Sequence, residues 1–257
     1  VSPTILFALA LPAAEYFALV LVAAGAMMAV VLANDLIVLF LLLETFSLAL
    51  YVLCASAAGS RPGLEAAVKY FVVGSVAGAF LLYGAAMAYA ATGSTHLDRV
   101  GAAVVSDGGQ AGVTALAGLA LLIVGLGFKA ALVPFHHWAP DVYEGAPTPV
   151  TGFMAGAVKA ATFAALTRVL WTGFAPFAEE WTMLLASVAV ASMLLGNLAA
   201  LVQSDIKRML GYGAIAQAGY VMAAIVAGEP NGVSAGLFYL LAYALMNVGA
   251  IAVLVGL

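Results

Sequence analysis

Residues 112–135 read GVTALAGLALLIVGLGFKAALVPF, an apolar run with a single charge, Lys129, that follows two closely spaced glycines and precedes Pro134. The run is long enough to cross the apolar core of a bilayer, which takes about 20 residues of helix. Pro134 removes one helical hydrogen bond and clashes with the carbonyl group of Ala130, and the glycines weaken the helix before the lysine. A lysine among helix breakers predicts an interrupted helix lining a cavity, as in many transporters. The alternative is a proline kink with a lysine paired for stability.

The rest of the chain is equally apolar. Of its 257 residues, 66% are hydrophobic and 8% are charged, whereas about a quarter are charged in soluble domains. The short alternating segments of a transmembrane barrel are not visible. We therefore predict an all-α polytopic membrane protein with about eight transmembrane helices, forming a single membrane domain over residues 1–257. The predicted spans are 14–33, 35–57, 64–91, 112–135, 149–171, 181–202, 206–227 and 233–256.

The connections between these spans are short and polar, so the chemistry must lie in or beside the membrane. One set of connections holds Arg61, Lys207 and Arg208, and the other holds Arg99 with Arg168 near a span end. This small excess of positive charge predicts that the first set faces the cytoplasm. Both ends of the chain lie in or beside apolar sequence, from which we expect a fragment of a longer protein.

Several classes of site are not indicated. The net charge of −4 and the lack of a basic patch argue against nucleic-acid binding. Cys54 is the single cysteine, and we interpret it as a small apolar residue of a span rather than part of a metal site. No hydrolase, zinc-protease or dinucleotide-binding motif is present, so we expect no metal and no redox cofactor bound by this chain.

Four ionisable residues lie inside apolar runs: Glu44, Lys69, Lys129 and Lys159. A charged side chain at the centre of a bilayer costs about 2.5–3.5 kcal/mol, so such residues usually face a bundle interior or a hydrated cavity. Glu44 follows Asp35 by nine residues, which places it about 14 Å deep and close to the midplane. Lys159 lies about 15 Å deep by the same measure, counted from Pro149.

Lys69 and His136 are weaker candidates. Lys69 is about five residues into its span, so its alternative role is an interfacial anchor that snorkels to the surface. His136 is a candidate to extend a proton path toward the cytoplasm, and its alternative is an interfacial residue beside Trp138. His137 points about 100° away on a helix, so we expect no metal site from this pair. We predict a structured loop for residues 141–149, because its glycine and prolines favour turns.

A buried lysine beside a mobile carboxylate has the properties of a proton relay. Desolvation disfavours the charged form of a lysine, and a nearby carboxylate favours it. A lysine whose carboxylate partner moves away would therefore bind and release a proton near neutral pH.

The sequence resembles a known family across nearly its whole length. The run GLGFKAALVPFHHWAPDVYEGAPTPV at 125–150 is similar to the central signature of the antiporter-like membrane subunits of complex I, the proton-pumping NADH:quinone oxidoreductase, and most closely to the subunit N family. Further similarity lies in NDL at 34–36 with Glu44, LEAAVKYF at 64–71, GNLAAL at 196–201, DIKRMLGYGAIAQAGY at 205–220 and AYALMN at 242–247.

This resemblance implies roles for the same residues. Glu44 matches the acid of family helix five, Lys129 the lysine of the broken helix seven, and Lys159 the central lysine of helix eight. Lys69 matches a helix-six lysine of less certain importance. The chain matches family helices four to eleven, which implies one full five-helix repeat over 14–171 and part of an inverted second repeat over 181–257. The paired positions of Asn34-Asp35 and Ser204-Asp205 agree with such a repeat.

Two departures from the family accompany these matches. The chain lacks the last three family helices, including the second broken helix with its own lysine. Gln217 stands where many relatives carry histidine, which puts a titratable relay on that helix in doubt.

The implied function is proton translocation through buried Glu and Lys residues, coupled to electron transfer from NADH to quinone in the respiratory chain. Other subunits would bind NADH, FMN, iron–sulfur clusters and quinone. The implied partners are the other membrane subunits, the lipid bilayer and protons, in a bacterial cytoplasmic (inner) membrane. The alternatives are a subunit of a multi-subunit sodium/proton antiporter or membrane-bound hydrogenase, and a structural module whose buried pairs only fix helix packing.

Overall fold

A computed structural model describes residues 11–57, 60–106, 112–228 and 230–256 as a bundle of helices. Over these residues there is no strand, and eight helices are long and apolar enough to cross a membrane. The α-helices are α2 (Ala13–Leu32), α3 (Leu36–Ala55), α4 (Arg61–Thr92), α5 (Leu97–Ser106), α6 (Gly112–Ala130), α7 (Trp138–Gly145), α8 (Thr148–Phe153), α9 (Lys159–Arg168), α10 (Ala178–Leu201), α11 (Ile206–Val226) and α12 (Asn231–Gly256). Two π-helical segments, η1 (Met154–Val158) and η2 (Val169–Gly173), and the 3-10 turn η3 (Ala175–Phe177) complete the described part.

The predicted fold class and the eight predicted spans are confirmed, with ends that differ by a few residues. Many large apolar side chains point outward from these helices, including Leu32 at 80% exposure and Leu201 at 82%. Such a surface suits lipid and not water. The residues at the two ends of the chain, 1–10 and 257, on which the expectation of a fragment rests, lie outside the described residues.

Two short helices differ from the sequence prediction. The predicted loop at 141–149 is wrong, because residues 138–145 form α7 and α8 begins at Thr148. Pro140 is compatible with this helix because a proline in the first turn costs no hydrogen bond. The polar connection after α4 contains a second unexpected helix, α5, which buries Leu97 and Val100.

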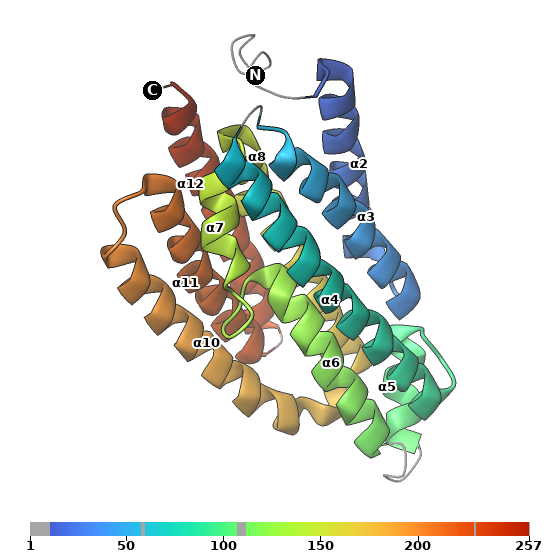
Figure 1. The fold of residues 1–257 in the computed structure, drawn as a ribbon. Helices are drawn as coiled ribbons and strands as arrows, with labels where there is room; N and C mark the ends of the chain where they lie inside the picture. The colour runs from blue at the N-terminus through green and yellow to red at the C-terminus, as the bar shows by residue number, and fades with distance from the viewer. Residues whose placement is uncertain (1–10, 58–59, 107–111, 229, 257) are drawn as a thin grey trace.

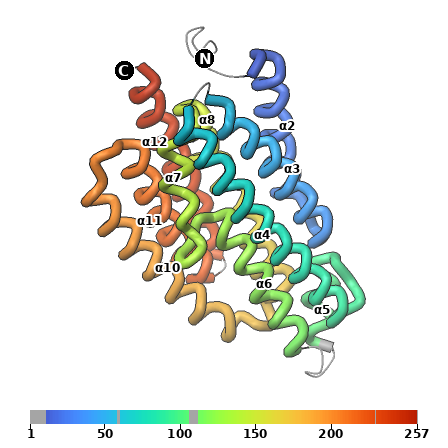
Figure 2. Tube along the Cα trace, viewed as in Figure 1, coloured from blue at the N-terminus to red at the C-terminus, as the bar shows by residue number. Residues whose placement is uncertain are grey.

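The span predicted at 112–135 ends earlier, at Ala130, where α6 stops. Figures 1 and 2 show α6 and α7 following one another across the bundle, joined by a loop in its middle. The predicted interruption of the helix at Lys129 is therefore present. α7 lies between α4 and α11, and α6 packs along α4. Small residues permit this close packing: a Cβ added to Gly118 would lie 3.0 Å from the carbonyl oxygen of Gly84.

Asp35 and Asp205 each cap the start of a long helix, and these two helices run in opposite directions. The Asp35 carboxylate accepts the backbone N–H groups of Ile37 and Val38 at the start of α3. The Asp205 carboxylate accepts the N–H of Arg208 at the start of α11. In Figure 1, α3 begins at the lower end of the bundle and α11 at the upper end. The division of the chain into two inverted repeats remains a prediction, which this arrangement suits.

Candidate functional site

The interruption after Lys129 is held by local hydrogen bonds that differ from those of a helix. Ala131 adopts a left-handed backbone conformation with φ of 58°, and Leu132 N–H donates to the carbonyl of Gly127 at 2.9 Å. The N–H of Val133 donates to the hydroxyl of Ser192 on α10 at 3.0 Å. Because Pro134 has no N–H to offer, the carbonyl of Ala130 lacks its normal helical donor and is available to another group.

Lys159 donates to that carbonyl. Its ammonium group lies 3.1 Å from the carbonyl oxygen of Ala130 and 2.7 Å from that of Ala214 on α11. The residue is 4% exposed, and no acidic side chain lies within ion-pair distance of it among the described residues. The π-helical segment η1 ends directly before Lys159, and single π turns are frequent at functional sites. Two backbone dipoles therefore hold this buried cation.

Lys129 is held differently, by side chains of α3. Its ammonium group lies 3.1 Å from Oε1 of Glu44 and donates to the hydroxyl of Ser47 at 2.5 Å. The Lys129 side chain is fully buried, whereas that of Glu44 is 20% exposed. The Tyr51 ring lies 5.8 Å from the ammonium group. The ion pair thus joins a buried base to an acid that retains some access to the outside of the bundle.

The space for the Glu44 carboxylate depends on a glycine of α4. A Cβ added to Gly78 would lie 2.9 Å from Oε1 of Glu44, closer than real contacts allow. A larger residue at position 78 would therefore displace the carboxylate from Lys129. Depth arguments selected Glu44 from the sequence, but no sequence signal singled out Gly78 or Ser47.

The structure brings three of the predicted site residues together around the break. Glu44 and Lys129 form the ion pair, and Lys159 binds the carbonyl of Ala130, the residue that follows Lys129. His136 lies in the loop between α6 and α7, is 7% exposed and stacks on His137 with ring centres 4.3 Å apart. Its Nδ1 atom has no hydrogen-bond partner in the described structure.

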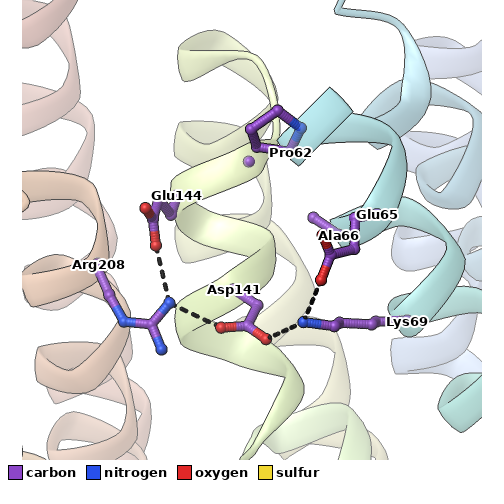
Figure 3. Close-up of a pocket in the computed structure, with 8 residues that line it drawn as sticks. Pro62, Glu65, Ala66, Lys69, Asp141, Glu144 and Arg208 are labelled. Atoms are coloured by element: carbon purple, nitrogen blue, oxygen red, sulfur yellow. Dashed lines mark hydrogen bonds and ion pairs between the residues drawn. The ribbon is translucent and has the colours of Figure 1, made fainter. Parts of the chain in front are cut away.

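Lys69 lies in a separate ion cluster between α4, α7 and α11 (Figure 3). It pairs with Glu65 at 2.8 Å and with Asp141 at 3.0 Å, and its side chain is 48% exposed. Asp141 also pairs with Arg208 at 2.7 Å, and Arg208 pairs with Glu144 at 2.8 Å. These residues line a cavity of about 190 Å³ between α4, α7 and α11. Lys69 therefore has acidic partners on its own helix and on α7, which a simple surface anchor would not need.

Sequence reasoning missed most of this cluster. The spacing of Glu65 and Lys69, four residues apart on a helix, was a usable signal for their ion pair. Asp141 and Arg208 are 67 residues apart, and only the tertiary structure pairs them.

Gln217 faces a second cavity of about 190 Å³, between α11 and α12. Its side-chain oxygen accepts a hydrogen bond from the Tyr239 hydroxyl. Ala214, whose carbonyl binds Lys159, lines the same cavity, together with Tyr243 and Asn247. Over the described residues, no group of three or more His, Cys, Asp or Glu side chains is arranged to hold a metal ion.

Comparison with known proteins shows which family has a similar sequence. Residues 33–257 match the family model described as NADH:quinone oxidoreductase/Mrp antiporter, TM. The chain is 47% identical to NADH-quinone oxidoreductase subunit N of Mycobacteroides abscessus over 92% of its own length and 44% of that protein. It therefore spans about half the length of the curated relatives it matches.

Solved structures give a similar result. A chain of respiratory complex I from Thermus thermophilus, with bound aureothin, matches with a TM-score of 0.79 and 46% identity, over 93% of this chain and 51% of that one. A chain of the Mrp complex from Dietzia sp. DQ12-45-1b matches with a TM-score of 0.83 and 26% identity, over 91% of this chain and 43% of that one.

Proposed function

The chain belongs to the NADH:quinone oxidoreductase/Mrp antiporter transmembrane family, and we propose that it acts as the proton-translocating subunit N of respiratory complex I. The observation that carries this proposal is the buried Lys129–Glu44 pair at the break of a transmembrane helix. A helix that only spans a membrane does not need a buried ion pair, and the insertion cost of the charges calls for a function.

The geometry supplies the parts of a proton relay. While Lys129 touches Glu44, the pair favours the charged lysine; when they separate, burial favours its neutral form and the proton leaves. Lys159 is the next base of the proposed path, because its ammonium group binds the carbonyl of Ala130, the residue that follows Lys129. Moving one charge against 100 mV costs about 2.3 kcal/mol, so the driving reaction must supply at least that for each proton.

The remaining parts of the proposal concern the complex. NADH, FMN, iron–sulfur clusters and quinone would bind to other subunits, and this chain would contact other membrane subunits in the bacterial cytoplasmic (inner) membrane. Lys69 and His136 are proposed as auxiliary residues of the path. Residues 14–171 would form the first repeat and 181–257 part of the inverted second repeat, which the opposed directions of α3 and α11 support.

A subunit of an Mrp-type sodium/proton antiporter is the second candidate, because the Dietzia Mrp chain has the higher TM-score of the two structures described above. The sequence identity favours complex I, at 46% against 26%.

The test uses the whole complex reconstituted in vesicles, with NADH-to-quinone electron transfer and proton uptake measured together. Glu44→Gln and Lys129→Met should lower the protons moved per electron while the complex still assembles. Glu15→Gln, at an exposed carboxylate in the first turn of α2, is the matched control and should pump normally. Undiminished pumping in both site variants would refute the proposal. Sodium-dependent proton exchange without NADH would favour the antiporter.

A further inference from the structure

The Asp141 carboxylate joins three helices (Figure 3). Its Oδ2 atom binds Lys69 of α4 at 3.0 Å, and its Oδ1 atom binds Arg208 of α11 at 2.7 Å, so each oxygen has its own cation. Exposed ion pairs contribute little to stability, but the Asp141 and Arg208 side chains are only 27% and 32% exposed. The pair therefore ties α7 to α11 with a defined geometry.

The same two elements carry the two acceptors of Lys159. On α11, Ala214 follows Arg208 by six residues, about 9 Å along one continuous helix. Between them, Gly211 lies directly against α7: an added Cβ would be 2.9 Å from Cα of Pro140. A rigid helix thus connects the ion pair to the first acceptor.

The second acceptor of Lys159, the carbonyl of Ala130, is connected to α7 at the break between α6 and α7. The indole N–H of Trp138, the first residue of α7, donates to the carbonyl of Phe128 at 2.9 Å. Phe128 lies two residues before Ala130, whose carbonyl binds Lys159. The start of α7 is therefore tied to the end of α6, two residues from the Ala130 carbonyl.

Lys207 reinforces the same joint without using a carboxylate. Its ammonium group donates to the carbonyls of Glu144 and Ala146, at 2.8 Å and 2.5 Å, at the carboxyl end of α7. A cation at this end also suits the helix dipole. Two consecutive residues of α11 thus hold the end of α7.

We propose that the Asp141–Arg208 ion pair positions Lys159 by fixing the separation between the carbonyl oxygens of Ala130 and Ala214. If the two carbonyls move apart, the buried ammonium group loses one of its two hydrogen bonds, and a buried cation with fewer partners is costly. Asp141 and Arg208 are positioning residues that act through α7 and α11. The inference rests on the proposed function only in that Lys159 is taken to carry protons.

The test measures the reactivity of Lys159 in the assembled complex, with a small membrane-permeant amine-reactive ester and mass spectrometry of the labelled peptide. Arg208→Gln and Asp141→Asn should speed acylation of Lys159 about fivefold, the effect of losing one modest hydrogen bond. Arg208→Lys should restore slow labelling, because it keeps a cation beside Asp141. Glu144→Gln, which removes only the outer partner of Arg208, is the control and should label like the wild type.

Acylation of Lys129 in the same samples separates positioning from general loosening. Faster labelling of Lys159 alone supports the proposal, whereas equal acceleration at both lysines, or none at Lys159, overturns it. Asp141→Asn keeps the side-chain size, so it serves if Arg208→Gln does not assemble. Proton pumping by Lys159→Ala is measured in parallel: normal pumping there would refute the proposed function while leaving the labelling result intact.

Discussion

The ammonium group of Lys159 donates a hydrogen bond to the carbonyl of Ala130, the residue that directly follows Lys129. The backbone acceptor of one buried lysine is therefore the neighbour in sequence of another, although the ammonium group of Lys129 itself binds Glu44 and Ser47 on α3. The acceptor exists because α6 ends at Ala130. The break would otherwise leave the Ala130 carbonyl without a hydrogen-bond donor. Lys159, the next base of the proposed proton path, supplies that donor and so stabilises the break.

Removing Lys129 alone should destabilise the protein more than removing the whole ion pair. Lys129→Met leaves the Glu44 carboxylate without its cation, at a cost of about 3 kcal/mol. The double variant Lys129→Met/Glu44→Gln should recover at least half of that cost, while pumping stays low in both. Thermal unfolding of the detergent-solubilised complex measures the difference. Equal stability of the single and double variants would contradict this expectation, because it would mean that the unpaired Glu44 carboxylate costs nothing.

Gly78→Ala should impair proton transfer without unfolding the bundle. The added methyl group would meet Oε1 of Glu44 at 2.9 Å and push the carboxylate away from Lys129. A misplacement of about 1 Å can lower a reaction rate by about 100-fold, so we expect proton pumping to fall by about tenfold to 100-fold. Pumping per electron is the readout. Gly25→Ala on α2 is the control, because nothing lies within 4 Å of its added Cβ.

Position 131 should favour glycine over branched residues. Ala131 has φ of 58°, and this left-handed conformation costs an L residue about 1–2 kcal/mol. Ala131→Gly should leave the free energy of unfolding within about 1 kcal/mol of the wild type, since the relief of strain offsets the extra chain entropy. Ala131→Val should lower it by more than about 1 kcal/mol. Denaturant titration of both variants tests this, and a stable valine variant would contradict it.

Asp35, in the connection before α3, should make stability depend on pH. Burial raises the pKa of its carboxyl. The opposing effects together are larger: the Thr95 hydroxyl, the N–H groups of Val38 and Ile37, and the charge of His96 all lower the pKa, so its net value is below the usual one. A carboxyl whose pKa is lower in the folded state than in the unfolded state stabilises the fold at pH values above its unfolded pKa of about 3.9. That stabilisation is lost as the pH falls through the pKa of the folded state. Asp35→Asn should therefore be less stable than the wild type at pH 7.

That difference should shrink as the pH falls below about 3.9, where the carboxyl of the unfolded chain becomes protonated, and should vanish below the lower pKa of the folded state. Unfolding midpoints of the two proteins between pH 3 and 7 provide the measurement. A constant difference over this range would show that the Asp35 charge does not contribute.

The sequence predicted elements whose signals are local. Long apolar runs identified the spans, because a bilayer requires about 20 apolar residues for each helix. The break near Lys129 followed from Pro134, since a proline cannot donate to the carbonyl four residues back. Residues 141–149 were predicted as a loop because their glycine and prolines suggested turns, yet residues 138–145 form α7. The spacing of Trp138 and Val142, both buried on one face, was the local signal for that helix.

The hydrogen-bond and ion-pair partners of the buried charges could not be predicted from the sequence. Depth along a helix selected Glu44 and Lys159, since it needs only the rise per residue, and the helix breakers around Lys129 selected that residue. Which atoms they meet depends on how helices rotate and pack, and this arises from contacts between residues far apart in the chain. Asp141 shows the difference well: its charge was visible in the sequence, but its two cations come from α4 and α11.

By itself, the sequence determined that this protein is a bundle of membrane helices with a few costly charges near the midplane, because the lipid solvent constrains length, apolarity and backbone hydrogen bonding along each segment. Only the tertiary structure decided that Lys129 meets a carboxylate while Lys159 meets two backbone carbonyls. The physical reason is that a buried charge must find partners, but several partners satisfy that need, and helix packing selects among them.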